Sequence, residues 1–456
     1  MHLREDNFPM STQIQNYVMG QWVFGSGTPT ILTNAVSGEE VGIASTAGIP
    51  FNEVLAYARQ QGGQSLRKMT FHERGRMLKA LALYLTERKL DYYTISYKTG
   101  ATKIDSWIDI DGGIGNLFAY ASLRRYFPNE TYYVDGELAK LSKQGSFIGH
   151  HIMVPREGVA LHINAFNFPV WGMLEKIAVN LMAGVPAVVK PATITSYLTE
   201  RVVRDIIASG ILPEGALQLL CGSIDGMLDH VMSQDVVTFT GSASTGKMLK
   251  RHPRIIDESV HFNMEADSLN AAVLGPDAVP GTEEFDLFIK EVRKEVTVKC
   301  GQKCTAVRRV LVPSNLVEDV SKALATALGK TAIGNPLNEQ VRMGSLAGMN
   351  QRNDVLEKLS ELTTQSSVLF GDPRGGSLID ANYESGAFMS PVLLFNDKPF
   401  DNMLTHEVEA FGPISTIMPY DTIEEAIAIT KLGKGSLVCS ITTHDDRIAR
   451  AFTLGA

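Results

Sequence analysis

The sequence predicts an α/β protein with two domains, each built on a parallel sheet. Short apolar runs alternate with helical patterns from residue 158 to 264, and they alternate again from about residue 265 to residue 456. Such alternation is typical of βαβ units. A chain of 456 residues also exceeds what one hydrophobic core normally serves, so more than one domain is expected.

The N-terminal third is predicted to be mostly helical. Residues 51–127 repeat apolar side chains at three- and four-residue spacing. Two extended runs follow, TYYVDGELAKL and SFIGHHIMVPREG, and they predict a hairpin or edge element at residues 131–157. We therefore assign residues 1–130 and 158–264 to the first domain and treat 131–157 as an appendage.

The parallel sheet of the first domain is predicted from four apolar runs, VALHIN, AVVK, LQLLCG and VVTFTG. The stretches SYLTERVVRDIIASG and SIDGMLDHVMS read as helices among them. Ligands of such sheets bind beyond the carboxyl ends of the strands. Asn167, Lys190 and the loop that starts at Gly241 follow strands and are therefore candidate binding residues.

The second domain, residues 265–456, shows the same alternation of short apolar runs and helical patterns. Strands are predicted at LNAAVLG, RRVLVP, MSPVLLF, ISTIMPY and GSLVCSITT. The segment FDLFIKEVRKEV places its apolar residues on one stripe, as an amphipathic helix does.

Composition excludes several classes of protein. The net charge of −8 argues against a general nucleic-acid binder, which needs a basic face. The polar N-terminus has no secretory h-region, and no apolar run is long enough to predict a membrane span. Four cysteines in so long a chain favour reduced thiols and a cytoplasmic location.

The loop GSASTGK, from Gly241 to Lys247, matches most of the phosphate-loop pattern. Met248 stands where that pattern needs a hydroxyl for Mg²⁺, so an NTPase is not expected. A strand, a glycine loop and a helix N-terminus still favour an anion, and a dinucleotide pyrophosphate is the favoured guest. A plain βα turn remains the alternative, and the ordinary GxGxxG fingerprint is absent.

The stretch KCGQKC holds two cysteines four residues apart. A structural zinc site needs four ligands, and Cys221 and Cys439 stand alone, so no metal site is expected. Cys300 is predicted to end the amphipathic helix and to have a packing role. Cys304 follows the small lead-in GQK, where four cations, Lys299, Lys303, Arg308 and Arg309, would favour a thiolate if they face it. A nucleophile and an inert buried thiol both fit Cys304 at this point.

Glu265, in HFNMEADSLN, ends an extended apolar segment, where carboxylates are uncommon. A general base is one interpretation, and a solvated charge at a strand end is the other.

Six motifs, taken in order, resemble the aldehyde dehydrogenase superfamily over nearly the whole chain. They are AFNFP, VVKPATITS, FTGSASTG, NMEADSLN, GQKCTA and EAFGP. The resemblance implies a Rossmann-like cofactor domain, a catalytic thiol domain and a small oligomerisation hairpin. It also implies Cys304 as nucleophile, Glu265 as base and Asn167 as oxyanion donor. The cofactor contacts that it implies are Lys190, Thr193, Gly241, Ser242, Gly246, Glu409 and Phe411.

The resemblance further implies oxidation of an aldehyde to an acid with NAD or NADP. Many relatives that prefer NAD have a glutamate where this chain has Thr193, and a carboxylate there would repel a 2′-phosphate. We therefore predict that NADP⁺ is accepted and preferred, with NAD⁺ possible.

Within the family, the wording resembles the dehydrogenase part of bifunctional proteins of phenylacetate degradation. That likeness implies a CoA-linked semialdehyde substrate, no nucleic-acid or membrane partner, and a homo-oligomer in the complete protein. The chain ends at ARAFTLGA, where the family's dehydrogenase unit continues, so we expect a C-terminally incomplete catalytic domain. The alternatives are an enzyme for another semialdehyde and an inactive fragment that binds only cofactor or subunits.

Overall fold

The computed structural model describes residues 12–456 and divides into two compact units. The first unit contains the chain up to Leu32, Glu40–Ile95 and Ser106–Ala266; the second contains Thr33–Glu39, Ser96–Asp105 and Asp267–Ala456. The second unit therefore includes two short stretches from the N-terminal third, which the sequence pattern does not indicate.

Within residues 12–456, the first unit is built on a sheet of seven strands in the order β12-β11-β8-β9-β10-β2-β3. Their bounds are β12 (His261–Ala266), β11 (Val236–Gly241), β8 (Ala160–Ile163), β9 (Ala187–Lys190), β10 (Leu217–Leu219), β2 (Asn16–Val18) and β3 (Gln21–Val23). The first five pair in parallel, and β2 and β3 add an antiparallel edge. The predicted parallel sheet is confirmed.

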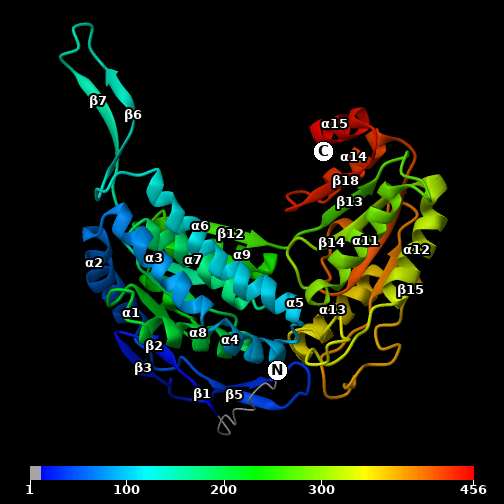
Figure 1. Cartoon of the computed structure of the whole chain (residues 1–456), viewed down its shortest axis with the longest axis horizontal. Helices are drawn as coiled ribbons and strands as arrows, with labels where there is room; N and C mark the ends of the chain where they lie inside the picture. The colour runs from blue at the N-terminus through cyan, green and yellow to red at the C-terminus, as the bar shows by residue number, and fades with distance from the viewer. Residues whose placement is uncertain (1–11) are drawn as a thin grey trace. The chain divides into compact units, whose positions relative to one another are not determined.

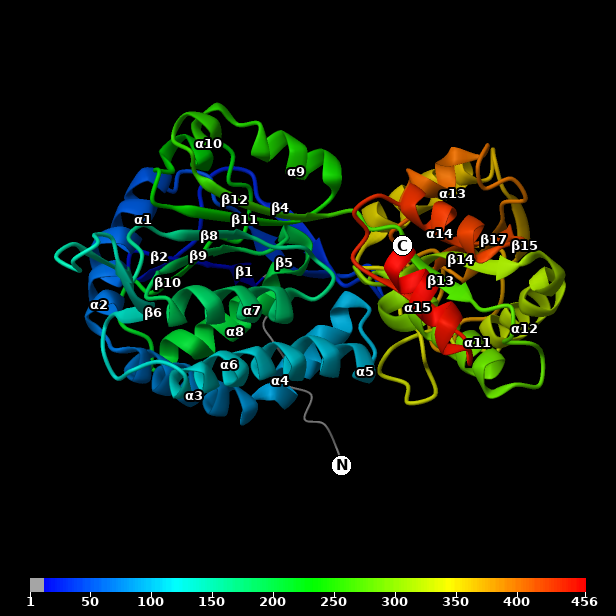
Figure 2. The ribbon, with the colours of Figure 1, turned by 90° about the horizontal axis from the view of Figure 1, so that it is seen from above.

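Helices cover both faces of this sheet (Figure 2). One face carries α3 (Phe71–Thr86), α6 (Gly112–Ser122), α7 (Pro169–Met182) and α8 (Ser196–Ala208); the other carries α1 (Phe51–Tyr57), α9 (Ala243–Lys250) and α10 (Pro253–Asp257). Neighbouring strand residues point to opposite faces, so Val189 lies in the core under α7 and Val188 in the core under α1. Burial on both faces explains why these strands are continuous apolar runs.

The predicted helical region at residues 51–127 is confirmed. It also contains α2 (Gly63–Lys68), α4 (Lys89–Ser96), α5 (Lys103–Ser106) and two π-helical turns, Ala58–Gly62 and Trp107–Asp111. The helix predicted at SIDGMLDHVMS is wrong. Only a 3₁₀ turn, Met227–His230, forms there, because Gly226 adopts a φ of 83° and interrupts the helical path.

The predicted hairpin at residues 131–157 is also confirmed. β6 (Tyr133–Lys140) and β7 (Ile148–Met153) pair antiparallel, and Figure 1 shows them projecting from the body of the first unit. Residues 13–44 also form a small sheet of three strands, in the order β1 (Gln13–Ile14), β5 (Glu40–Ala44) and β4 (Thr30–Thr33).

In the described part of the chain, the second unit contains a sheet of six strands in the order β15-β16-β17-β14-β13-β18. Their bounds are β15 (Ser367–Phe370), β16 (Val392–Phe395), β17 (Ile414–Tyr420), β14 (Val307–Pro313), β13 (Asn270–Leu274) and β18 (Cys439–Thr442). All neighbours are parallel except β15 and β16. The five runs that predict strands all form them.

The sheet of the second unit is also covered on both faces. α11 (Glu283–Thr297) and α12 (Val317–Gly329) pack on one face, and α14 (Ile423–Leu432) and α15 (Asp446–Gly455) pack on the other. α13 (Met349–Leu362) contributes to a further core cluster that includes Cys300. Among residues 12–456, every helix is too short or too polar to span a bilayer.

Candidate active site

In the first unit, the candidate residues lie at the carboxyl edge of the parallel strands, as the sequence predicts. Asn167 follows β8, Lys190 ends β9, Gly241 ends β11, and Glu265 lies in β12. The strand register pairs Ile163 with Lys190, and Thr240 with Glu265. The fold therefore gathers residues that are about 100 positions apart in the chain.

Lys190 and Glu265 belong to opposite faces of this sheet. Lys190 is in register with Ile163, whose side chain lies in the core on the α1 face. Glu265 is in register with Thr240, two residues after Thr238, which contacts His162 under α7. Because side chains alternate along a strand, Glu265 projects on the α7 face.

The glycine loop starts α9. The Ser242 hydroxyl accepts a hydrogen bond from the Thr245 N–H and caps the helix. Gly246 is buried, and a Cβ there would lie 2.6 Å from the Met264 sulfur. Any larger residue at this position would therefore force the Met264 side chain to shift.

Lys190 is half-buried at its strand end. Burial lowers the pKa of Lys190, and nearby Cys221 and Asp225 act in the opposite direction. Thr193 begins the 3₁₀ turn Thr193–Thr195, immediately after this strand end. A cation and a hydroxyl-bearing residue therefore stand close together in the chain at the sheet edge.

Asn167 is buried just before α7, and a residue that the sequence analysis missed sets the start of that helix. Asp109 Oδ1 accepts from the N–H groups of Val170 and Trp171, at 3.0 and 2.7 Å. Asp109 thus occupies the donors that would otherwise attract an anion to this helix end. The Asn164 side chain is buried with neither amide atom paired in the protein.

In the second unit, a turn with unusual backbone geometry precedes Cys304. Lys299 and Cys300 have left-handed φ values of 51° and 53°, and Gly301 follows at 68°. Such a conformation costs roughly 1–2 kcal/mol for each residue that carries a Cβ. A Cβ at Gly301 would collide with the Gly412 carbonyl, so this position must be glycine.

Polar side chains hold the backbone around Cys304. Asn270 Nδ2 donates to the carbonyl oxygens of Cys304 and Ala306, at 2.8 and 2.9 Å. Gln302 Nε2 donates to the Lys299 carbonyl at 3.0 Å. These buried contacts fix the path of the loop. Asn270 is the last residue of the NMEADSLN motif, although the motif did not indicate this contact.

The two thiols of this region differ sharply. Cys300 is fully buried, and burial, followed by the nearby Asp105 carboxylate, raises its pKa. Cys304 is only half-buried. The packing prediction for Cys300 is therefore supported by its place in the core, although it lies beyond the end of α11 rather than within it.

The four cations near Cys304 in sequence, Lys299, Lys303, Arg308 and Arg309, each have identified partners. Lys303 pairs with Glu295, with 2.7 Å between Nζ and Oε1. Arg309 donates to the carbonyls of Leu269, Ile429 and Thr430. Lys303 and Arg309 thus pair with a carboxylate and with backbone carbonyls, and a positive environment around the Cys304 thiol stays a prediction.

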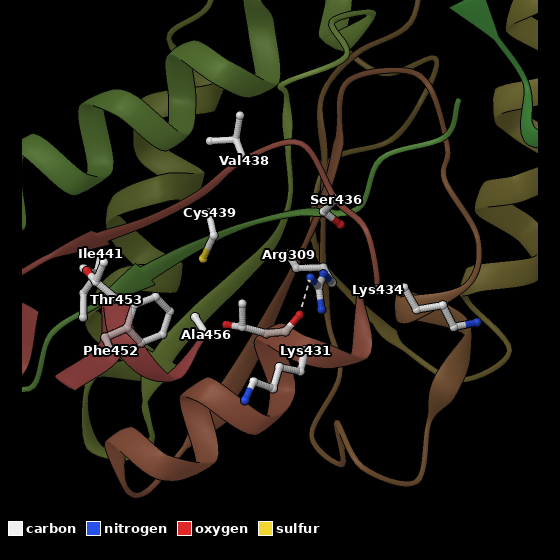
Figure 3. A pocket seen from close by; sticks show the side chains of 11 residues that line it. Arg309, Lys431, Lys434, Ser436, Val438, Cys439, Ile441, Phe452, Thr453 and Ala456 are labelled. Atoms are coloured by element: carbon white, nitrogen blue, oxygen red, sulfur yellow. Dashed lines mark hydrogen bonds between the residues drawn. The ribbon is translucent and has the colours of Figure 1, made fainter. Parts of the chain in front are cut away.

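Arg309 lines a cavity of about 540 Å³ instead (Figure 3). Figure 3 shows its guanidinium donating to the Thr430 carbonyl, with Cys439, Lys431 and Lys434 on the same walls. None of the sequence-predicted site residues lines this cavity.

Arg308 connects the remaining candidates. Its guanidinium donates to the Gly301 carbonyl at 2.8 Å and to Glu409 Oε1 at 3.2 Å, and it lies 5.4 Å from the centre of the Phe411 ring. Glu409 Oε2 also accepts from the Ser268 N–H. Burial raises the pKa of Glu409, and Arg308 acts against that rise. The fold thus brings the Cys304 loop, Glu409 and Phe411 together in the second unit.

No cluster of three or more metal-ligating side chains occurs among residues 12–456.

Residues 28–454 match the model of the aldehyde dehydrogenase family. The chain belongs to the aldehyde dehydrogenase family. This aldehyde dehydrogenase is 42% identical over 434 residues to a 3,4-dehydroadipyl-CoA semialdehyde dehydrogenase from Aromatoleum evansii, covering 95% of this chain and 84% of that protein. It is 26% identical over 450 residues to an alpha-ketoglutaric semialdehyde dehydrogenase from Bacillus subtilis, covering 94% and 85% of the two chains.

Solved structures confirm the predicted aldehyde dehydrogenase fold. A betaine aldehyde dehydrogenase from Staphylococcus aureus in complex with NAD⁺ superposes with a TM-score of 0.85 at 21% identity, covering 97% of this chain and 85% of that one. An NAD⁺ complex of an aldehyde dehydrogenase from Bacillus cereus gives a TM-score of 0.84 at 20% identity, with 97% and 87% covered.

Proposed function

We propose that this aldehyde dehydrogenase oxidises a CoA-linked semialdehyde to the carboxylic acid. The relative at 42% identity carries that substrate class in its name, and the relative at 26% identity also acts, by its name, on a semialdehyde. A semialdehyde of phenylacetate degradation is the specific substrate that we favour, on the wording of the motifs in this chain.

Cys304 is the proposed nucleophile. The observation that carries the proposal is the contrast in one loop: the Cys304 thiol is half-buried on a turn whose backbone is hydrogen-bonded by Asn270, whereas Cys300 is sealed in the core. A held thiol can attack an aldehyde carbon and form a thiohemiacetal, and loss of hydride then leaves a thioester.

Asn167 and Glu265 are assigned the two supporting roles. The Asn167 amide and the Cys304 N–H would donate to the oxyanion, and losing one such donor typically costs roughly 3–4 kcal/mol of transition-state stabilisation. Glu265 would take a proton from water as that water hydrolyses the thioester. Its half-buried place at a strand end suits a base that must meet water.

The residues also fit a nicotinamide dinucleotide, which supplies the hydride acceptor when bound. The glycine loop with Gly241, Ser242 and Gly246 leads into the N-terminus of α9, and the positive end of that helix would favour a pyrophosphate. Lys190 would contact the adenosine ribose, Glu409 the nicotinamide ribose and Phe411 the ring. The uncharged Thr193 beside Lys190 imposes no repulsion on a 2′-phosphate, so we propose that NADP⁺ is preferred over NAD⁺.

An assay of reduced-cofactor formation tests the function. The purified chain is given three kinds of substrate, each with NADP⁺ or NAD⁺. They are a CoA-linked semialdehyde, the same semialdehyde with a free carboxylic acid in place of the CoA thioester, and a set of simple aldehydes. We expect the highest kcat/KM for the CoA-linked compound with NADP⁺. Equal kcat/KM with and without CoA would contradict the substrate class.

A second candidate is an enzyme for a different, CoA-free semialdehyde, and the alpha-ketoglutaric relative favours it. The same set of substrates separates the two. Cofactor binding without turnover of any aldehyde would instead indicate a binding fragment.

We also propose that the β6–β7 hairpin binds a second copy of the chain. It carries exposed apolar side chains along its length, among them Val134, Phe147, Ile152 and Val154, which a lone projecting hairpin would leave in water. Replacing Phe147 and Ile152 with Ser should shift the protein to a smaller species on native sizing. The same replacement at exposed Ile31 and Leu83 serves as the control.

A further inference from the structure

A stretch of the N-terminal third packs beneath the turn that leads to Cys304. Residues Ser96–Asp105 belong to the second unit, although nearly 200 positions separate them from Lys299. Asp105 and Lys299 are each 2% exposed. The segment was marked by no motif, and the proposed chemistry does not use it.

Asp105 holds the left-handed turn directly. Its Oδ1 accepts the backbone N–H of Lys299 at 2.8 Å, and its Oδ2 accepts the N–H and the hydroxyl of Thr102 at 2.8 and 2.7 Å. Both carboxylate oxygens are therefore engaged, and one of them grips the first residue of the strained turn.

The Lys299 side chain makes the second contact with the segment Ser96–Asp105, and we call these contacts of Asp105 and Lys299 the clamp. Its Nζ donates to the Thr99 hydroxyl at 2.8 Å and to the Thr99 carbonyl at 3.2 Å. Its own carbonyl accepts from Gln302, whose Oε1 accepts from the N–H of Ala347. Both backbone groups of Lys299 are thus tied, so the left-handed turn has little freedom to relax to a commoner conformation.

We propose that Asp105 is a positioning residue for Cys304: it anchors the left-handed turn Lys299–Gly301 through the Lys299 N–H and so fixes where the thiol lies. The inference rests on the proposed role of Cys304 as nucleophile. Asp105 acts through the backbone, because its carboxylate is bound to Lys299 and Thr102.

Asp105→Ala is the main test, with Asp277→Ala as its matched control. Asp277 lies in the same unit and likewise accepts two backbone N–H groups and one threonine hydroxyl, those of His444, Asp445 and Thr443. Hydrogen exchange is followed in peptides that cover residues 298–306. Asp105→Ala should speed exchange there about tenfold, while Asp277→Ala should leave these peptides unchanged.

Measurements of kcat and KM distinguish a positioning role of Asp105 from a general contribution to stability. In Asp105→Ala, kcat should fall about tenfold or more with KM for aldehyde and cofactor nearly unchanged, because misplacement of a reacting group acts on the chemical step. Asp105→Asn keeps an oxygen for the Lys299 N–H and should recover most of kcat, which also covers the case that the alanine variant fails to fold. A parallel loss in kcat from Asp277→Ala would overturn the proposal.

Alkylation keeps the proposal testable even if no aldehyde is turned over. Cys304 should react with iodoacetamide several-fold faster in Asp105→Ala, because the released turn exposes the thiol, and Cys439 should react at its wild-type rate. Unchanged exchange at residues 298–306, or unchanged Cys304 alkylation, would overturn the clamp. An inactive wild type with a faster Cys304 in Asp105→Ala would reject the proposed function and keep the clamp.

Discussion

Arg308 and Glu409 form a buried ion pair, with 3.2 Å between the guanidinium Nε and Oε1, and both side chains are about 95% buried. The same guanidinium donates to the carbonyls of Gly301 and Gly412. Removing this buried guanidinium would leave the Glu409 carboxylate and both backbone carbonyls without their donor, which costs stability.

Arg308→Met should therefore destabilise the protein by about 3–5 kcal/mol, since it leaves the Glu409 carboxylate buried without its cation. Urea unfolding of wild type and variant measures the difference. The surface pair Lys322–Glu318 offers the control, because Lys322→Met should leave the unfolding midpoint nearly unchanged. Similar effects from the two variants would contradict the importance of the buried pair.

Cys304→Ala should lower kcat by about 10⁴-fold or more, because no other group of the loop can form the thioester. Cys300→Ala should keep most of the activity, since burial raises the pKa of that thiol and seals it from substrate. Steady-state kinetics with any accepted aldehyde decide the matter. Equal losses in both variants would show that the assignment of the nucleophile is wrong.

Glu265→Gln should stall after hydride transfer, because the amide cannot take a proton from the hydrolytic water. Rapid mixing should then show a burst of reduced cofactor close to one equivalent, followed by slow turnover. Wild-type turnover in this variant would remove Glu265 from the mechanism. Glu283→Gln, at an acidic helix start in the second unit, is a suitable control.

Thr193→Glu should shift the cofactor preference toward NAD⁺. A carboxylate near the adenosine ribose would repel a 2′-phosphate, so the ratio of kcat/KM for NADP⁺ to that for NAD⁺ should fall about tenfold or more. The ratio is measured with one aldehyde at saturation. A strong NAD⁺ preference in the wild type would contradict the proposed cofactor at the outset.

His162 should make the protein sensitive to acid. The ring is buried between Thr238 and Asn180, and burial lowers its pKa from 6.5 to about 4. Between these two pKa values the unfolded chain binds a proton that the folded chain does not, so stability falls as pH falls through this window. The expected loss is about 2 kcal/mol from about pH 7 to about pH 5. His162→Gln should show a smaller loss in urea titrations at the two pH values.

Local sequence patterns predicted most of the secondary structure, because the apolar runs of the sequence coincide with the strands that are buried in these sheets. VALHIN, AVVK and VVTFTG form strands, and their carboxyl ends hold Asn167, Lys190 and Gly241 as predicted. The exception, SIDGMLDHVMS, has helical spacing, but the left-handed Gly226 ends any helix there.

Long-range contacts could not be read in the same way. Lys299, Arg308 and Arg309 each contact a group more than 100 positions away in the chain, at Thr99, Glu409 and Ile429, and their clustering in sequence gives no indication of these partners. Asp109 accepts hydrogen bonds from backbone N–H groups, and such a role leaves no motif in the sequence. Asn270 ends the motif NMEADSLN, but its donation to backbone carbonyls could not be read from that motif.

The second unit is assembled from three separate stretches of the chain, and this has a consequence for biosynthesis. Residues 33–39 and 96–105 leave the ribosome early, yet the partner of Asp105 is made 194 residues later. The early segments can pair with each other, through the Ala35 N–H and the Lys98 carbonyl, but they can reach Lys299 only after Ser106–Ala266 has been translated. A fragment that begins at Asp267 would lack Asp105 and therefore its contact with the Lys299 N–H.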